Sequence, residues 1–476
     1  MGTKEKFIRD YVKEILQGNA AVFAGAGLSR SSGFVNWKEL LQPLANDIGL
    51  NIEYEYDLTK VAQYIKNKNG NRDDINNSIL SAFGTGVELN ESVRILTRLP
   101  IKTYWTTNYD HLLEDGLKEA QRNPDVKIEY KQLSMTKKDT DAIVYKMHGD
   151  VDHPADAVLT KDDYVKYNKT HPFFRNFLQG DLISKSFLFV GFSFEDPNLN
   201  FVLDQIRLVM DENIHNHYCF VKKINTTDCK NEEEFQGKET LETLREEYLK
   251  KYGIQTVFVD DYKEIPDILK EVEAAVLANN VFISGSATFY DNGWSKERVE
   301  KLADKLANEL VKAGFKVTSG FGLGIGSSVI NGALKAIYAG NKHSDDYLRL
   351  KPFSQNINAE EKEAKHTQYR EDFLKNNGVA IFMFGNKKDD LSGEKVLSNG
   401  CRQEFDIAKA KGCRIIPIGS TGDMAEKIYA EVKSEHEADR SKYAYLDNYM
   451  TLLGTETDID KIVDAVLEIV KIQRKG

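Results

Sequence analysis

The sequence predicts an α/β protein made of two consecutive Rossmann-type domains, each built around a parallel sheet. Short apolar runs alternate with amphipathic, helix-like runs, which is the pattern of strands joined by crossover helices. Glycine-rich turns follow apolar runs at residues 25–27, 284–286 and 320–326, and such turns hold phosphate groups in nucleotide-binding folds. The length of 476 residues fits two or three domains of ordinary size.

The composition argues against several classes of function. No window approaches the roughly 20 consecutive apolar residues of a membrane span, and the first residues contain no apolar signal core. The net charge of -10 opposes binding to a polyanion, so nucleic acid is not expected as a partner. The four cysteines form no C-x-x-C pair, which predicts a reducing compartment. We therefore expect a cytoplasmic protein that binds neither a membrane nor nucleic acid.

The first half of the chain alternates between helix-like and strand-like segments. Phe7, Tyr11 and Ile15 recur at helical spacing and predict an amphipathic helix over residues 4–17, and the apolar residues before Gly25 predict the first strand. The later segments predict strands over residues 102–110, 142–150, 186–194, 217–223 and 254–262, and helices over residues 36–50, 111–121, 173–185, 197–210, part of 224–253, and 263–280.

The pattern starts again at residue 279 with a strand that leads into a Gly-Ser turn. A helix over residues 295–315 follows, in which Gly314 occupies the position of a C′ glycine. The remaining segments predict strands over residues 316–320, 378–386 and 413–419, and helices over part of 321–337 and over 401–412. The sequence therefore predicts two domains, residues 1–277 and residues 278–476.

The first glycine turn, "AVFAGAGLSR", does not match the dinucleotide fingerprint of oxidoreductases. That fingerprint needs G-x-G-x-x-G and an acidic residue about 20 positions later, at the end of the next strand. Gly25 and Gly27 fit, but Arg30 stands at the third glycine, and the region 20 positions on lies in a predicted helix. Hydride transfer is therefore disfavoured, and the turn alone fits a ligand-free strand-to-helix connection equally well.

Three other predicted strands end in polar residues. "TTNYD" contains Asn108 and Asp110, "KMHGD" contains His148, and "GFSFEDPN" follows the third strand. Because parallel strands bring their carboxyl ends to one edge of a sheet, we expect these segments to converge on one crevice with the first turn. Each has a simpler explanation: Asn108 as a turn residue, His148 as a hydrogen-bonded core histidine, and Asp196 as a helix N-cap, which is the preferred interpretation for Asp196.

Together, "GAGLS", "TTNYD", "KMHGD" and "GFSFEDPN" resemble the sirtuin family over roughly residues 10–270. The resemblance implies that NAD is bound as substrate and that its nicotinamide–ribose bond is cleaved, with Asn108 and His148 as catalytic residues. Asn108 would hold the ribose or an attacking water, and His148 would accept a proton. The implied NAD-binding residues are Ala24, Gly25, Ala26, Gly27, Ser29, Asp110, Gly191 and Ser193; Asp110 either positions the nicotinamide amide or braces its loop.

The chain departs from the protein-deacylating sirtuins in one respect. Those enzymes carry a zinc module with two paired-cysteine motifs, whereas Cys219 and Cys229 are the only cysteines in the middle of this chain. We therefore expect a sirtuin-like domain without a zinc module and without a metal, and water as the acceptor, which makes an NAD glycohydrolase. The alternatives are a non-catalytic module that senses NAD or ADP-ribose, and an NAD-dependent protein deacylase.

The second half resembles the SLOG superfamily, whose Rossmann-like domains bind nucleotides. Its two glycine turns predict a phosphate cradle, with Arg370 pairing with phosphate and Glu404 with ribose hydroxyls. The enzymes of that superfamily carry P-G-G-x-G-T-x-x-E, of which this chain keeps only the terminal acid, so ligand sensing is favoured over catalysis.

The order of the two domains resembles the effector family of the bacterial Thoeris anti-phage defence system. That resemblance implies a homotetramer in which a cyclic ADP-ribose isomer, made by a TIR-domain partner protein, binds the SLOG domain and activates NAD depletion in abortive infection. The implied activator-binding residues are Ser284, Gly285, Ser286, Gly322, Leu323, Gly324, Arg370, Lys387 and Glu404.

Overall fold

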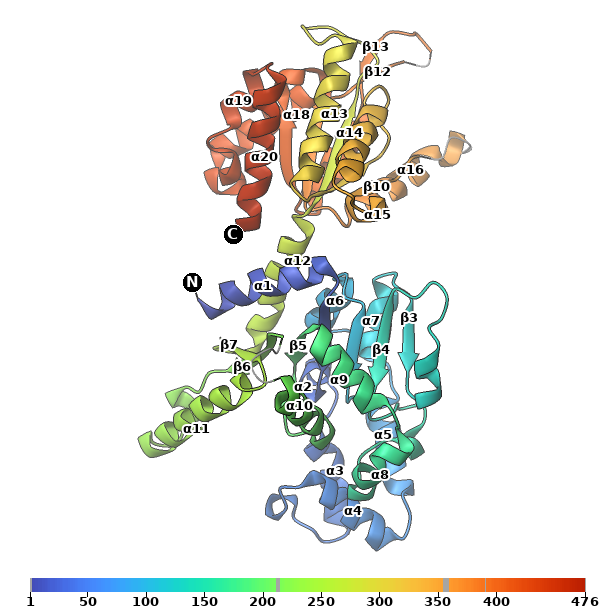
Figure 1. The fold of residues 1–476 in the computed structure, drawn as a ribbon, viewed down its shortest axis with the longest axis vertical. Helices are drawn as coiled ribbons and strands as arrows, with labels where there is room; N and C mark the ends of the chain where they lie inside the picture. Colours follow the sequence, from blue (N-terminus) through green and yellow to red (C-terminus); the bar gives the residue numbers. More distant parts are fainter. Residues whose placement is uncertain (1, 211–214, 354–358, 390, 476) are drawn as a thin grey trace. The chain divides into compact units, whose positions relative to one another are not determined.

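The computed structural model describes residues 2–210, 215–353, 359–389 and 391–475. The chain divides into two compact units, Met1–Glu273 and Ala274–Gly476, and the division falls within helix α12 (Ile265–Leu277). Figure 1 shows both units as sheets flanked by helices, as the predicted α/β class requires.

The first unit contains a seven-stranded sheet in the order β3-β4-β2-β1-β5-β6-β7, in which every pair of neighbours is parallel. This confirms the Rossmann-type parallel sheet. β1 lies at the centre, with β2 on one side and β5 on the other. The strands are β1 (Ala20–Ala24), β2 (Thr103–Thr106), β3 (Pro124–Lys127), β4 (Ala142–Lys146), β5 (Ser186–Val190), β6 (His217–Lys222) and β7 (Ile254–Val259).

Helices cover both faces of this sheet, and four of them, α3, α4, α5 and α8, group at one end of it (Figure 1). The sequence patterns did not predict α4, α5, α6, α8 or the edge strand β3. Besides α12, the helices are α1 (Thr3–Gln17), α2 (Ala26–Arg30), α3 (Trp37–Asp47), α4 (Leu58–Asn69), α5 (Asp73–Phe83), α6 (Glu91–Arg98), α7 (Leu112–Glu119), α8 (Lys161–Thr170), α9 (Phe174–Ser184), α10 (Pro197–Met210) and α11 (Glu232–Lys250).

The centre of the sheet is apolar on both faces. Every residue of β1 and β5 is buried, as continuous apolar strands in a helix-covered parallel sheet should be. Phe23 and Phe189 stack with their ring centroids 5.4 Å apart, which ties β1 to β5. The register pairs Ala24 with Thr106 and with Val190, so the ends of the three central strands lie side by side.

The second unit contains a five-stranded parallel sheet in the order β10-β9-β8-β11-β14 and a separate antiparallel pair, β12 and β13. β8 is again central, so the chain moves to one side of it and then returns to the other. The strands are β8 (Asn280–Ser286), β9 (Lys316–Ser319), β10 (Leu348–Leu350), β11 (Val379–Phe384), β12 (Asn386–Lys388), β13 (Lys395–Leu397) and β14 (Arg414–Ile418).

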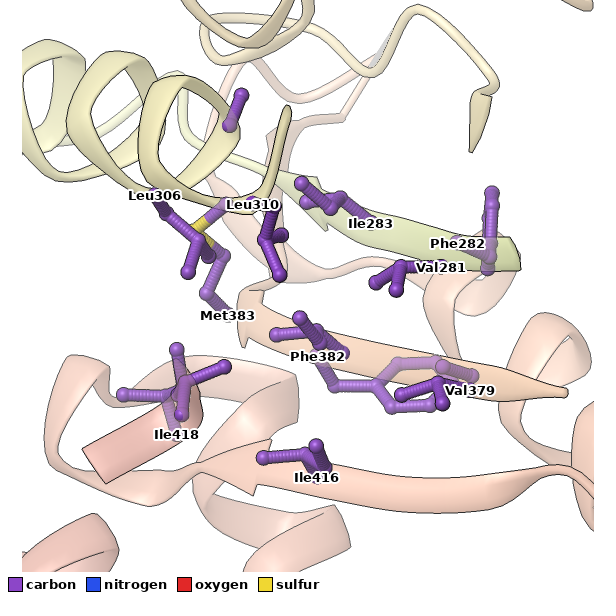
Figure 2. Close-up of a cluster of buried hydrophobic side chains, with 14 of the residues drawn as sticks. Val281, Phe282, Ile283, Leu306, Leu310, Val379, Phe382, Met383, Ile416 and Ile418 are labelled. Atoms are coloured by element: carbon purple, nitrogen blue, oxygen red, sulfur yellow. The ribbon is translucent and has the colours of Figure 1, made fainter. Parts of the chain in front are cut away.

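The core of this unit lies between its sheet and the helices on both faces. Figure 2 shows Leu306 and Leu310 of α13 over side chains of β8 and β11, including Ile283 and Met383. Gly314 has a φ of 85°, as expected for the glycine that ends α13. The helices are α13 (Lys296–Lys312), α14 (Gly326–Ala339), α15 (Ser344–Tyr347), α16 (Ala359–Leu374), α17 (Asn399–Ala410), α18 (Asp423–Ala438), α19 (Met450–Thr455) and α20 (Ile459–Lys475).

Within the described residues, no helix combines the length and the apolar character that a membrane-spanning segment needs.

Candidate functional site

The glycine turn after β1 packs directly against the segment after β5. Gly25 N donates to Val190 O at 2.9 Å, and Gly27 N donates to Gly191 O at 2.9 Å. A Cβ on Gly25 would lie 2.4 Å from Gly191 O, and Gly191 itself has a φ of 66°. Glycine is therefore required at these positions, because two backbone segments approach closely and one adopts a left-handed conformation. The two segments predicted to hold NAD are thus neighbours.

Asn108, after β2, is hydrogen-bonded to this turn. Its Nδ2 donates to Gly25 O at 3.0 Å and to Ser29 Oγ at 2.8 Å. Ser29 Oγ in turn donates to Asp110 Oδ2 at 2.6 Å, and Asp110 Oδ1 accepts from Leu112 N at 3.1 Å. Ser29 and Asp110 are buried, whereas Asn108 is half-exposed. Asp110 therefore braces its loop against α2 and α7, and Asn108 fixes the β2 end relative to the glycine turn.

His148, after β4, is completely buried. Its Nε2 lies 3.3 Å from Asp196 Oδ2 and 3.3 Å from Asn198 Nδ2, at the start of α10. The ring centroid of Tyr164 lies 5.5 Å away and that of Trp37 6.2 Å away. Burial lowers the pKa of His148 and the Asp196 carboxylate partly offsets this, so the imidazole is neutral near pH 7 and can accept a proton.

A buried lysine connects the loops that carry Asn108 and His148. The Lys146 ammonium donates to Tyr109 O at 3.0 Å and to Asp110 O at 2.6 Å, and it pairs with the carboxylates of Asp150 and Glu114. Burial lowers the pKa of Lys146, but the two carboxylates outweigh burial and raise it above its ordinary value, so Lys146 stays charged. The network joins the end of β4 to the loop after β2 and thereby fixes both segments.

The second unit has an equivalent polar cluster at the end of β8. Ser284 Oγ donates to Glu404 Oε2 at 2.6 Å, and Arg370 Nε lies 3.6 Å from Glu404 Oε1. Arg370 also donates to Gln403 and stacks over the ring of Phe353. Ser284, Arg370 and Glu404 are all buried, and burial raises the pKa of Glu404. These residues come from β8, α16 and α17, so the structure brings three of the predicted activator-binding residues together.

The glycine-rich segment before α14 lies against the end of β8. A Cβ on Gly322 would lie 2.0 Å from Gly285 O, and one on Gly324 would lie 1.8 Å from Ala287 O. Leu323, between them, is exposed, and its carbonyl accepts from Ala287 N at 2.8 Å. These two glycines are therefore needed for the close approach of two backbone segments of the protein itself.

Two further predicted residues lie near the same strand ends. Ser286, the last residue of β8, is buried and pairs in register with Phe384 of β11, and its hydroxyl has no hydrogen-bond partner among the described residues. Lys387 lies in β12 and is half-exposed. Ser286 therefore ends β8 and Lys387 follows the end of β11, and these are the strand ends at which the SLOG resemblance places a nucleotide.

Two family models match consecutive parts of the chain. Residues 102–257 match the family model of the SIR2-like domain, and residues 264–473 match that of the Sir2- and TIR-associating SLOG family. The NAD(+) hydrolase ThsA of Bacillus cereus (strain MSX-D12) is 43% identical over 476 residues, which cover 98% of each chain. The chain belongs to the ThsA NAD(+) hydrolase family. The ThsA proteins of Cytobacillus dafuensis and Enterococcus faecium are 41% and 40% identical, over 99% and 98% of this chain and 97% and 98% of theirs.

In this ThsA family member, the predicted segments of the first unit do meet at the sheet. Ala24, Thr106 and Lys146 are aligned in register as the last residues of β1, β2 and β4, and Val190 ends β5 beside Ala24. Ala26 and Gly27 lie in the first turn of α2, for which Gly25 is the N-cap, while Ser193 is exposed in the loop after β5. That these residues bind NAD stays a prediction, since it follows from the resemblance.

Three residues that surround the predicted site residues had no predicted part in catalysis. Lys146 and Asp150 stand in the quoted motif "KMHGD" and Asp196 in "GFSFEDPN", but the first two had no predicted role and Asp196 only that of an N-cap. The N-cap is confirmed, because Asp196 Oδ1 accepts from Asn198 N and Leu199 N. The sequence did contain a signal for the pairing of Lys146 with Asp150. A charged residue within a buried strand, as Lys146 is in β4, needs a partner of opposite charge.

In this ThsA family member Cys219 and Cys401 are buried, and one group of described side chains has the spacing of metal ligands. Burial raises the pKa of Cys401 to about 11 and of Cys219 to about 12, so both are unreactive thiols. His111, Asp150 and Asp152 bring possible ligand atoms within 4.8 Å of one another, but Asp150 already pairs with Lys146. The absence of a metal cofactor stays a prediction.

Proposed function

We propose that this chain is an NAD glycohydrolase that cleaves NAD to nicotinamide and ADP-ribose, with water as the acceptor. The observation that supports this most strongly is the position of Gly25, Asn108, His148 and Gly191 at the ends of four adjacent parallel strands. Ligands of open parallel sheets bind at this edge, where the chain order reverses at the central strand. The shared description of the relatives as NAD(+) hydrolases supports the same substrate here.

In the proposed reaction, the positively charged nicotinamide ring of NAD leaves as neutral nicotinamide. The site must therefore mainly stabilise the positive charge that develops on the ribose, which becomes oxocarbenium-like. Asn108 holds the ribose or the attacking water by hydrogen bonds, and His148 accepts a proton from water or from a ribose hydroxyl. The glycine turn and the segment at Gly191 and Ser193 hold the rest of NAD, with the pyrophosphate at the turn and the adenosine ribose beside Gly191.

We further propose that the second unit regulates this reaction. A cyclic ADP-ribose isomer made by a TIR-domain partner protein binds the cluster of Ser284, Arg370 and Glu404 in a cytoplasmic homotetramer, and NAD is depleted in anti-phage defence. The burial of Arg370 beside Glu404 supports a nucleotide ligand, because phosphate and ribose hydroxyls complement these two groups. Binding must favour the active state by its differential affinity for that state.

Incubation of the purified chain with NAD, with and without cyclic ADP-ribose isomers, tests the reaction through chromatography of released nicotinamide. Release that increases with an isomer supports the proposal. Absence of release under every condition favours a non-catalytic sensing module, and release that requires an acylated peptide favours a deacylase.

Arg370→Lys tests the regulatory site. Lysine keeps the positive charge but cannot form the bidentate hydrogen bonds that a guanidinium makes to phosphate. We therefore expect the isomer concentration for half-maximal nicotinamide release to rise at least about tenfold. The matched control is Arg402→Lys on α17, where the guanidinium pairs with Glu431 of α18 and should leave that concentration unchanged. An equal effect of both substitutions would contradict the assignment of Arg370 to the activator site.

A further inference from the structure

The single carboxylate of Asp196 contacts both the start of α10 and the ring of His148. Oδ1 accepts from Asn198 N at 3.0 Å and from Leu199 N at 2.9 Å, which satisfies the N-terminus of the helix. Oδ2 accepts from the Tyr164 hydroxyl at 3.0 Å and lies 3.3 Å from His148 Nε2. Because the cap uses only one oxygen, the other remains directed at the imidazole and the tyrosine.

We propose that Asp196 is a positioning residue that keeps the proton of neutral His148 on Nε2 and leaves the Nδ1 lone pair as the acceptor in catalysis. The role of His148 as a base belongs to the proposed NAD cleavage, and this inference rests on it. Nδ1 is buried and has no hydrogen-bond partner among the described residues, so it is the ring nitrogen that the protein leaves unengaged. The nitrogen that accepts the proton is thus Nδ1, and the residue that keeps the proton of the neutral ring on Nε2 is Asp196.

Asn198 competes for the same nitrogen. Arg175 Nε donates to Asn198 Oδ1 at 3.2 Å, which directs Asn198 Nδ2 toward His148 Nε2 at 3.3 Å. An amide donor at this position favours the opposite tautomer, with a bare Nε2. The negative charge of Asp196 Oδ2, 3.3 Å from Nε2, opposes this preference, because at the low dielectric of a buried site a carboxylate stabilises a proton on the nearest ring nitrogen more strongly than a neutral amide disfavours it.

The ring itself is held by aromatic side chains. Tyr164 and Tyr167 meet His148 edge-on, with centroids 5.5 Å and 6.3 Å away, and Trp37 covers it at 6.2 Å. A 180° flip of the imidazole, which exchanges Nδ1 with Cδ2 and Nε2 with Cε1, would therefore disturb three large side chains. The packing preserves the orientation that the Asp196 carboxylate selects.

In the resulting step, water replaces nicotinamide on the ribose and His148 takes the proton that water releases. The bond between nicotinamide nitrogen and ribose C1′ breaks, and its electron pair stays on the nicotinamide ring nitrogen. The water oxygen forms a bond to C1′ and gives one proton to His148 Nδ1. The imidazolium so formed carries its charge 3.3 Å from Asp196 Oδ2, where the carboxylate stabilises it.

The test measures the tautomer directly by ¹⁵N NMR of histidine-labelled full-length chain, with the His148 signals assigned by their loss in His148→Gln. We expect the Nε2–H tautomer in the wild-type chain. Asp196→Asn retains the helix cap, since asparagine is an equally good N-cap, but it removes the charge. We expect it to shift His148 toward Nδ1–H and to lower kcat for nicotinamide release at least about tenfold, with KM for NAD within about twofold.

Asp57→Asn is the matched control, because Asp57 caps α4 through Thr59 N and Lys60 N. It should change neither the tautomer nor kcat. Tyr164→Phe keeps the carboxylate and should keep Nε2–H, which provides a second readout if Asp196→Asn does not fold. An Nδ1–H tautomer in the wild-type chain, or an unchanged tautomer and kcat in Asp196→Asn, would overturn the inference. The tautomer is measured in the absence of NAD. A chain that does not cleave NAD can therefore still show whether Asp196 keeps the proton of His148 on Nε2.

Discussion

Replacement of Lys146 by methionine is expected to lower the free energy of unfolding of the first unit by about 3–5 kcal/mol, the effect of removing one partner from a buried ion pair. Methionine fills a similar volume but leaves Glu114 without its ammonium partner and releases the carbonyl groups of Tyr109 and Asp110. Asp150 would retain its contact with His111. The loss should be large because the Lys146 side chain is completely buried, so water cannot replace the missing cation.

Urea unfolding followed by tryptophan fluorescence measures this effect in a Trp294→Phe background, in which Trp37 and Trp105 of the first unit are the remaining reporters. The control is Lys161→Met, because the Lys161 side chain is 48% exposed and lies 3.6 Å from Asp57. An exposed pair of this kind contributes at most about 1 kcal/mol. A loss in Lys146→Met no larger than in Lys161→Met would show that the buried network does not stabilise the unit.

Gly191→Ala should abolish the close contact between the first glycine turn and the segment after β5. A Cβ at this position would lie 2.1 Å from Leu28 N and 2.6 Å from the carbonyl carbon of Gly27, and the φ of 66° adds strain for any other residue. The clash is with backbone, so the turn must shift. Because misplacement of about 1 Å costs about a hundredfold in rate, we expect kcat/KM for nicotinamide release to fall at least about a hundredfold, together with a lower Tm.

Gly180→Ala is the matched control for that substitution. Gly180 lies in α9, and no atom of a neighbouring residue lies within 4 Å of the position that a Cβ would take, so alanine fits and should raise helix stability by about 0.5–1 kcal/mol. Nicotinamide release by Gly180→Ala should equal that of the wild-type chain. If Gly191→Ala were as active as Gly180→Ala, the interlocked turn would not be needed for catalysis.

The sequence predicted the fold class and the strand ends because the central strands are continuous apolar runs that stop at glycine or polar residues. "AVFAGAG" and "SFLFVGFS" are both of this kind, and they pair in the sheet. The strand β3 and helix α6 were missed because they span only four and eight residues, too few to show a clear period.

The pairing of His148 with Asp196 is a contact between residues 48 positions apart, a distance that neither spacing nor composition encodes. The N-cap role of Asp196 was predicted correctly. A cap uses only one carboxylate oxygen, however, and the contacts of the other oxygen depend on where the fold places the start of α10 relative to His148. Similarly, the burial of Ser284, Arg370 and Glu404 in one cluster depends on β8, α16 and α17 converging. Such tertiary contacts lie outside local sequence patterns.

The most direct test of the proposed reaction compares nicotinamide release by wild-type and His148→Gln chains under the same NAD and cyclic ADP-ribose isomer concentrations. We expect the wild-type chain to release nicotinamide and ADP-ribose in equal amounts and His148→Gln to lose at least about a hundredfold in rate, while remaining folded by circular dichroism. Equal rates for the two chains, or no release by the wild-type chain with any isomer, would contradict it.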